Sequence, residues 1–589
     1  MAQRVYTSDS ANLRNDDLDD QQHDITGGLL GNTAAESSLY DHDTKDDLSD
    51  ENHIEPTEQE LSTLNRVADA LPLGAWLVVV IEFCERFMFY GTSGPFQNYI
   101  QNSPHSKPLG ALGLGQRGAT MLNNFWNFWC YFTPIFGAII ADQYLGRYRT
   151  ICLFGIFYLI GSVILFSTSF PAAIESGASL GGFITAIIIM GLGAGGIKPN
   201  VSPLVAEQCS RTQRTIKVLP SGKRVIIDPA VTAQRVFMTF YWAINVGSLS
   251  SMATTQLRKD VGYWAAFLLP LCMFVIGLLV LFLGRSKYIV RPPQGSVIPR
   301  SFQALWIGFV NGCNMDKAKP SVIATRSSGD KALWDDHFID ELKRALTACR
   351  IFLFFPIYWV CYFEMTTNLI SQAGQMKTGS TPNDFLQNLN PITLIIFIPI
   401  FDRLVYPGLR KVGIRMLPMT RIILGFFTAA ASMAYAAGVQ HMIYTTGPCF
   451  KNFSDGCTEN NVNVWIQTPA YVLIALSEIF ASITGLEYAY TKAPSSMKSF
   501  VMAMFLLTYA GGAILGIALA SVAVDPKLVW MYTAIAVTAV ISGISFWACF
   551  KHLNGMEDEM NALEAKGQQA VPVGSIVQSK KSNHHNLNA

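Results

Sequence analysis

Long apolar stretches recur along almost the whole of this chain, and they limit its fold more than any other feature. Half of its 589 residues are hydrophobic and 14% are charged, whereas about a quarter of the residues in a soluble protein are charged. A helix needs about 20 mostly apolar residues to cross a bilayer, and the chain has about twelve such segments. We therefore expect an all-α membrane protein in contact with the lipid bilayer. The segments are residues 72–100, 116–144, 149–170, 181–207, 232–257, 262–284, 347–374, 387–409, 419–441, 465–490, 498–522 and 528–550.

Lys and Arg are concentrated in alternate connections between these segments. Residues 285–291 hold three of them, whereas residues 171–180 hold none. Basic connections stay in the cytoplasm, so we expect both termini to be cytoplasmic. The longest connection divides the segments into two bundles of six, an architecture with a substrate site between its halves. The expected parts are a disordered acidic tail (1–70), an N-terminal bundle (71–284), a cytoplasmic linker (285–345), a C-terminal bundle (346–551) and a second disordered cytoplasmic tail (552–589).

Within the linker, residues 334–344 have an amphipathic pattern. Such a pattern predicts a short helix that lies on the membrane surface.

Several functional classes do not fit the composition. The net charge is +1, and no basic domain, zinc-ligand spacing or nucleophile constellation is present. Gly191, Gly193 and Gly196 match the GxGxxG spacing of dinucleotide sites, but that motif requires a preceding strand, and these glycines lie within an apolar segment. We therefore expect no nucleic-acid partner, no metal, no organic cofactor and no enzymatic activity.

One polar connection combines two cysteines with a glycosylation sequon. Cys449 and Cys457 flank Asn452, which begins the sequence Asn-Phe-Ser. The charge pattern places this connection outside the cell, where a disulfide and a glycan can both form. Two unpaired thiols are the alternative that the sequence leaves open.

The first segment carries Glu82, Glu85 and Arg86 within its apolar run. A charged side chain at the centre of a bilayer costs about 2.5–3.5 kcal/mol on insertion scales. These three side chains must therefore face a protein interior or a water-filled cavity. A purely structural ion pair is the alternative to a functional role.

Other ionisable residues lie within later segments. Lys198 belongs to the first half of the chain, whereas Glu364 and Glu478 belong to the second. A cavity between the halves would thus have cations on one wall and acids on the other, a field that suits a zwitterion such as a peptide or an amino acid. The polar residues Tyr131, Asn245 and Asn390 either line that cavity or form hydrogen bonds between helices.

Taken together, these stretches resemble the proton-coupled oligopeptide transporter family, and especially its fungal di- and tripeptide permeases. The resemblance covers residues 71–551. The matching motifs are Glu82–Gly91, Gly137–Gly161, Gly195–Asn200, Phe237–Leu249, Leu389–Pro391, Ile400–Asp402, Gly485–Tyr488 and Ala493–Met497.

The resemblance implies a major facilitator fold and import of di- and tripeptides with protons by alternating access. Protons are then the coupling ion, the working unit is a monomer, and the location is the plasma membrane, with the vacuolar membrane as the alternative. It implies the following roles. Arg86 and Lys198 bind the peptide carboxylate, and Glu478 binds the amino terminus. Asn245 and Asn390 contact the peptide backbone, and Tyr90 and Tyr131 line the pocket. Glu82, Glu85, Arg86, Lys198 and Glu364 take part in proton coupling.

Three positions depart from the family pattern. Phe89 replaces one of two tyrosines, and Asn124 stands where animal relatives have a histidine. Phe363 occupies the usual position of an acid, and Glu364 follows it, which turns the carboxylate by about 100° around the helix. Two rival functions are transport of another charged solute and peptide sensing without transport.

Overall fold

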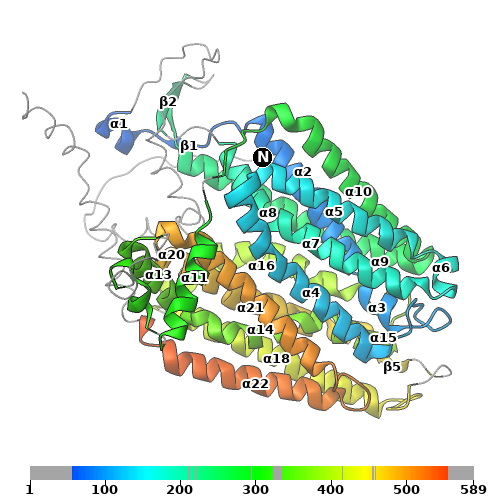
Figure 1. Ribbon diagram of the computed structural model, residues 1–589. Helices are drawn as coiled ribbons and strands as arrows, with labels where there is room; N and C mark the ends of the chain where they lie inside the picture. Colours follow the sequence, from blue (N-terminus) through cyan, green and yellow to red (C-terminus); the bar gives the residue numbers. More distant parts are fainter. Residues whose placement is uncertain are drawn as a thin grey trace, which may run out of the picture.

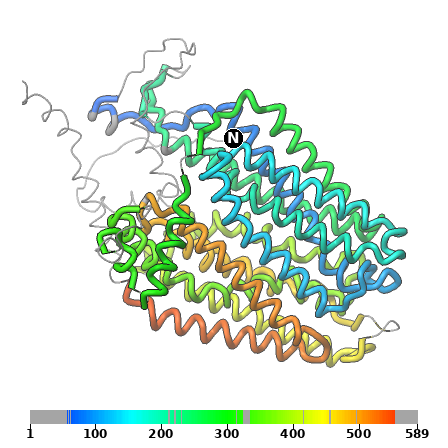
Figure 2. The backbone as a smooth tube through the Cα atoms, in the orientation of Figure 1, coloured from blue at the N-terminus to red at the C-terminus, as the bar shows by residue number. Residues whose placement is uncertain are grey.

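The computed structural model describes residues 56–554, except 210–212, 219–221, 294, 313, 323–333, 414–415, 454–456 and 458. The predicted tails therefore lie mostly outside the described residues, but residues 56–70 of the first tail are not disordered as expected, because they include the helix Glu58–Thr63 and the strand Arg66–Val67. Helices dominate the described chain, and Figure 1 shows them in two groups. The same division is visible in the backbone trace of Figure 2, where the blue-to-green half lies above the yellow-to-orange half.

Among the described residues, the N-terminal group contains seven principal helices and two short ones. They are α2 (Leu73–Ser93), α3 (Phe96–Gln101), α4 (Gly115–Ile140), α5 (Arg147–Ser167), α6 (Pro171–Glu175), α7 (Ala178–Glu207), α8 (Pro229–Ser248), α9 (Ser250–Asp260) and α10 (Tyr263–Leu283). The contacts of α5 with α7, α4 with α7 and α2 with α10 hold this group together.

The C-terminal group contains α14 (Phe355–Phe363), α15 (Asn368–Gly374), α16 (Leu389–Ile400), α17 (Tyr406–Lys411), α18 (Pro418–Thr445), α19 (Thr468–Ser477), α20 (Thr484–Lys492), α21 (Lys498–Leu519) and α22 (Leu528–Phe550). Its main internal contacts join α18 to α22 and α14 to α21. The two groups meet where α21 packs against α4.

Within the described residues, nine helical segments are long and apolar enough to cross a membrane. They correspond to the third, fourth and sixth to twelfth predicted segments. Helices α2, α4 and α8 occupy the other three, and these are more polar; α2, for example, carries Glu82, Glu85 and Arg86. The all-α membrane fold expected from the sequence is thus present.

The seventh predicted segment is not one continuous helix. A 3₁₀ turn, η6 (Glu364–Thr366), separates α14 from α15, and Thr367 leaves the helical region with φ −123° and ψ −96°. The hydroxyls of Thr366 and Thr367 both donate to the carbonyl of Phe363, at 3.2 and 2.9 Å. Side-chain hydroxyls that compete for a helix carbonyl favour such a break.

A polar chain attaches α15 to the rest of its half. Gln467 donates to Gln372 (2.8 Å), Gln372 to Gln440 (2.8 Å), and Gln440 to Gln375 (2.7 Å). Gln375 then donates to Asp525 at 2.8 Å, in the connection between α21 and α22. Burial raises the pKa of Asp525, although this hydrogen bond opposes the shift.

The structure also has a small sheet that the sequence did not predict. Strand β3 (Arg224–Ile227) pairs with β2 (Thr215–Val218) in antiparallel and with β1 (Arg66–Val67) in parallel orientation. Arg224 forms an ion pair with Glu60 at 2.7 Å, which adds α1 (Glu58–Thr63) to this unit. The connection between α7 and α8 is thereby joined to the segment that precedes α2.

The described part of the linker includes the helices α11 (Val297–Val310) and α13 (Asp336–Cys349), of which the sequence predicted α13. The apolar side chains Ile339, Leu342 and Ala345 of α13 are fully buried, and α13 contacts α20 and α21. The predicted membrane-surface position of residues 334–344 is therefore wrong, because protein already covers the apolar side of this helix.

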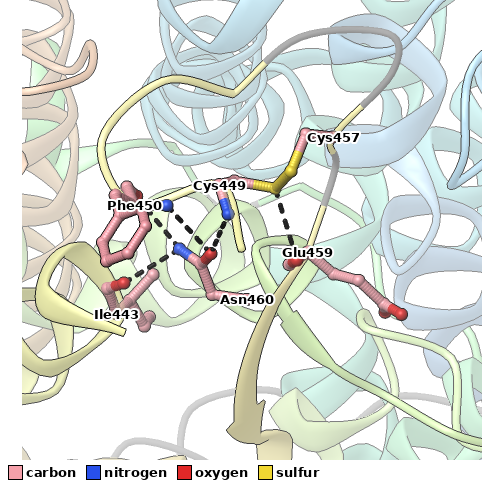
Figure 3. The surroundings of a disulfide bond; sticks show 6 residues. All are labelled: Ile443, Cys449, Phe450, Cys457, Glu459 and Asn460. Carbon is pink, nitrogen blue, oxygen red and sulfur yellow. Dashed lines mark hydrogen bonds between the residues drawn. A yellow bond between two sulfur atoms is a disulfide. The ribbon is translucent and has the colours of Figure 1, made fainter. Parts of the chain in front are cut away.

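Cys449 and Cys457 form a disulfide with a Cα–Cα distance of 5.5 Å (Figure 3). The buried amide of Asn460 orders the same loop: its oxygen accepts from the backbone N–H groups of Cys449 and Phe450, at 2.7 and 3.0 Å. Asn452 is exposed, but residue 454 of its sequon lies outside the described residues, so a glycan stays a prediction.

Helices α4 and α7 cross in close backbone contact. A Cβ on Gly137 would lie 2.3 Å from the carbonyl oxygen of Gly195 and 2.7 Å from the Cα of Gly196. Small residues at such crossings let backbones approach closely in membranes. This contact fixes the position of α7, which carries Lys198, relative to α4, which carries Tyr131.

Gly137→Ala should therefore destabilise the protein by about 1–3 kcal/mol, the usual cost of overpacking. The matched control is Gly438→Ala in α18, where a Cβ meets no atom within 4 Å. Thermal unfolding of the purified variants in detergent would compare them. Equal midpoints for the two variants would contradict the close crossing.

Candidate substrate and proton site

Helix α2 places two acids around one arginine in the protein interior. The side chains of Glu82, Glu85 and Arg86 are 5%, 0% and 9% exposed. Arg86 Nε lies 3.0 Å from Glu82 Oε1, and Arg86 Nη2 forms an ion pair with Glu85 Oε2. Because isolated charges are expensive in this environment, the three groups stabilise one another.

Lys198 of α7 completes this group in an unusual way. Its Nζ atom is buried and has no hydrogen-bond partner among the residues that the structure describes. It lies over two aromatic rings instead, 3.9 Å from the centroid of Phe89 and 4.4 Å from that of Tyr131. Cation–π contacts of this kind stabilise a desolvated ammonium group by about 2 kcal/mol, and the ring of Phe89 makes one without the tyrosine hydroxyl.

The guanidinium of Arg86 lies over the same Phe89 ring, with Cζ 5.5 Å from its centroid, so this ring joins Lys198 to Arg86 and its two glutamates. Two acids and two bases thus share one interior region, which we call the four-charge cluster: Glu82, Glu85, Arg86 and Lys198. With all four groups ionised, its net charge is zero.

The C-terminal half contributes an acid of its own. Glu478 is half-buried, and its Oε2 accepts a hydrogen bond of 3.4 Å from Asn390 of α16. It begins a π-helical segment, η10 (Glu478–Ile483), between α19 and α20. Such segments often occur at functional sites, and this one was not predicted from the sequence.

A layer of stacked rings connects the halves beside Lys198. Tyr131 of α4 stacks on Tyr509 of α21 with centroids 4.3 Å apart, and Tyr509 stacks on Trp359 of α14 at 3.4 Å. Trp359 is fixed by donating from Nε1 to Thr508 at 2.8 Å. Tyr509 is a site neighbour that sequence reasoning missed, because one more tyrosine in an apolar segment carries no distinguishing signal.

Glu364 lies in a different network from the four-charge cluster. Its Oε2 accepts from Asn368 at 2.8 Å, and Asn368 Oδ1 in turn accepts from Gln116 (3.0 Å) and Thr120 (2.9 Å) of α4. Phe363 instead lies near Tyr131, with centroids 6.4 Å apart. The structure therefore does not bring Glu364 to Arg86 or Lys198, which agrees with its shift of one position along the helix.

Two further predicted residues contact neighbours in their own helices. Asn245 is 8% exposed, and its amide donates to the carbonyl of Tyr241 in its own helix at 2.8 Å. Tyr90 is half-buried with its ring edge-on to Phe89 at 5.2 Å. A role for either residue in substrate binding stays a prediction.

The halves are also joined by buried polar contacts that the sequence did not suggest. Arg258 Nη2 of α9 lies 2.8 Å from Asp384 Oδ1, with side chains 4% and 0% exposed. Asn98 of α3 donates to Asn383 at 2.8 Å and to Asp384 at 2.9 Å. We call these four residues the outer lock, because the predicted orientation places them toward the outside of the cell.

Sequence reasoning could not have found the outer lock. Arg258 lies at the end of one predicted segment and Asp384 in a polar connection, 126 residues apart, where each has the appearance of an ordinary solvated charge. Among the described residues, no group of three His, Cys, Asp or Glu side chains is placed to hold a metal ion.

Comparison with known proteins gives consistent matches. A sequence profile described as "PTR2: POT family" matches residues 148–540. The "Probable peptide transporter ptr2" of Schizosaccharomyces pombe is 55% identical, over 88% of this chain and 84% of the relative. "Peptide transporter PTR_C" of Candidozyma auris is 50% identical, over 95% of this chain and 98% of the relative.

A solved structure is similar over nearly its whole length. The crystal structure of the "POT family transporter PepTSo" matches with a TM-score of 0.66 at 23% identity, covering 83% of this chain and 99% of that one. This likeness shows that the two chains share a fold.

The outer lock makes a stability prediction. Asp384→Asn leaves the Arg258 guanidinium buried without a counter-ion, and breaking a buried pair in this way costs about 3–5 kcal/mol. The thermal unfolding midpoint in detergent should fall clearly. The double variant Arg258→Gln/Asp384→Asn, which removes both charges, should recover most of the loss; a double variant less stable than Asp384→Asn would contradict the pairing.

Proposed function

This chain belongs to the POT family, and we propose from that membership and its geometry that it is a proton-coupled symporter that imports di- and tripeptides by alternating access. Its fold is of the major facilitator type. It is a transporter and not an enzyme. The observation that supports a peptide substrate best is the distribution of charge: the N-terminal half contributes a neutral cluster that contains two cations, and the C-terminal half contributes Glu478.

The two ends of a peptide fit these two walls. Its carboxylate is complementary to Arg86 and Lys198, and its ammonium group is complementary to Glu478. Lys198 is well placed for this exchange, because its Nζ is held by aromatic rings rather than by a hydrogen-bond acceptor. Asn390, which already donates to Glu478, would keep that carboxylate oriented and, with Asn245, contact the peptide backbone, while Tyr90 and Tyr131 would line the pocket.

Charge balance in the four-charge cluster explains why a proton should accompany the peptide. The cluster is neutral when all four groups are ionised, so a bound carboxylate would leave one uncompensated negative charge in the interior. Burying such a charge is costly. A proton on Glu82 or Glu85 restores neutrality and releases part of Arg86 for the substrate.

This balance supplies the coupling for alternating access. A protonated, peptide-loaded site is neutral on both walls and favours closure of the halves around the substrate. Loss of the proton restores both ion pairs of Arg86 and weakens its hold on the peptide. The proton and the peptide thus shift the same conformational equilibrium, as coupling between two ligands requires.

The same reasoning extends to the setting of the protein. We place it in the plasma membrane as a monomer, with the vacuolar membrane as the alternative location. The Cys449–Cys457 disulfide supports an oxidising compartment for its loop. Protons are the coupling ion, and no organic cofactor is required.

Uptake into proteoliposomes tests the function directly. A labelled dipeptide should accumulate only with an inward proton gradient, and Glu478→Gln should abolish that accumulation. The matched control is Glu459→Gln, the same substitution at an exposed position, which should transport normally. Binding of the dipeptide without accumulation would favour a sensor, and no response would favour another charged solute.

Peptides with a modified amino or carboxyl end distinguish the contributions of the two walls to substrate binding. N-acetylation removes the ammonium group. An acetylated dipeptide should therefore compete with a labelled dipeptide for binding to the purified wild type roughly ten- to a hundredfold less well, as expected for a charged hydrogen bond of about 1.5–3 kcal/mol. In Glu478→Gln this penalty should shrink, while the penalty for a carboxyl-terminal amide should persist. In Lys198→Gln the reverse should hold; unchanged penalties in both variants would refute the assignment of the two walls.

A further inference from the structure

Helix α11 of the linker has two apolar sides, and only one of them is covered. Ile298, Ser301, Ala304 and Gly308 are buried against the protein. The opposite side carries four large hydrophobic residues that are exposed: Phe302 (37%), Trp306 (67%), Phe309 (66%) and Val310 (64%). A helix that is hydrophobic all round is normally buried on every side, so something should cover this surface, which we call the outer face of α11.

The covered side fixes where α11 lies relative to the membrane-spanning helices. Ile298 packs in one cluster with Ile135 of α4 and Ala503 of α21, and Leu507 borders it. Ala503 and Leu507 lie in the second and third turns of α21. The beginning of α11 is therefore at the level of the spans rather than beyond their ends.

The surface next to this contact already faces lipid in a membrane-spanning protein. Phe136 of α4 follows Ile135 directly and is 48% exposed. Farther along α11, Phe302 packs edge-on against Phe500 in the first turn of α21, with centroids 6.1 Å apart. Phe500 is itself fully buried, so α4 alone, through Phe136, continues the outer face of α11 with an exposed apolar surface. Figure 1 shows α11 crossing the end of the C-terminal group rather than running along it.

The charge around α11 matches the same surroundings. Residues 284–310 contain four basic residues, Arg285, Lys287, Arg291 and Arg300, and no Asp or Glu. All four are exposed. Anionic lipids of the cytoplasmic leaflet attract such segments by about 1 kcal/mol per basic residue, and Trp residues prefer the boundary between headgroups and acyl chains.

We propose that α11 lies in the cytoplasmic surface of the bilayer, with Trp306, Phe309 and Val310 at the boundary between acyl chains and headgroups and the basic residues of the segment that leads into α11 near the lipid phosphates. A second copy of the chain is a poorer fit, because a symmetric interface would bring the basic residues of two segments together. The linker is then anchored in lipid at a point where it touches both halves of the transporter. This inference rests on the membrane-spanning fold and is independent of the proposed substrate.

Photocrosslinking from position 306 tests the occupant of this face. The full chain carries p-benzoylphenylalanine in place of Trp306 and is reconstituted into phosphatidylcholine and phosphatidylserine vesicles. The control carries it in place of His337, whose side chain is 70% exposed on α13. After irradiation, mass spectrometry should find several-fold more phospholipid adduct at position 306 than at position 337. Crosslinked dimers would show that a second copy of the chain covers this face and would overturn the proposal. Equal amounts of phospholipid adduct at both positions would also refute it.

A second measurement avoids the unnatural residue. Lipids brominated near the headgroup end of the acyl chain quench tryptophans that lie close to them. Trp306→Phe should reduce the quenched share of the fluorescence, whereas Trp334→Phe should not, because the Trp334 indole is held inside the linker by donating to the carbonyl of Ala318 at 3.0 Å. An unchanged quenched share in Trp306→Phe would overturn the proposal.

Discussion

Ionisable side chains inside a bilayer must compensate one another, and the arrangement of this protein follows from that requirement. A single buried charge costs several kcal/mol, so Glu82, Glu85 and Arg86 form ion pairs within one helix. Lys198 joins them from α7, where two aromatic rings hold its ammonium group. The result is a group that is neutral as a whole but in which every member can change partners. That property is what a site needs if it must admit a charged substrate and release it again.

The other strong contacts hold the two halves around this group. The layer formed by Tyr131, Tyr509 and Trp359 joins them beside the four-charge cluster. The outer lock joins them again, through the fully buried pair of Arg258 and Asp384. Polar contacts of this kind require a specific geometry, and they lose most of their stabilising free energy when the partners separate. They are therefore suited to hold one arrangement of the halves until binding favours another.

The sequence predicted much of this because hydropathy and intramembrane charge are strong local signals. The apolar segments matched helices, and the charged residues Glu82, Glu85, Arg86 and Lys198 do lie together in the interior. Glu364 shows the limit of this reasoning. The family resemblance groups it with them in proton coupling, but in the structure it follows the break at Glu364–Thr366 and accepts a hydrogen bond from Asn368. The linker shows the same limit. The amphipathic pattern predicted a membrane-surface helix at residues 334–344, but protein covers the apolar side of that helix, and the exposed apolar face belongs to α11.

The sequence by itself thus determined which segments are helical, which side chains bear charge in an apolar setting, and which family the chain resembles. These properties depend on the composition of short stretches, which the bilayer constrains strictly. Only the tertiary structure decided the pairing of Arg258 with Asp384, the aromatic contacts of Lys198, the separation of Glu364 from the cluster and the position of α11. Each of these depends on the meeting of residues far apart in the chain, and on the exact rotation of a helix, which a hydrophobic pattern does not encode.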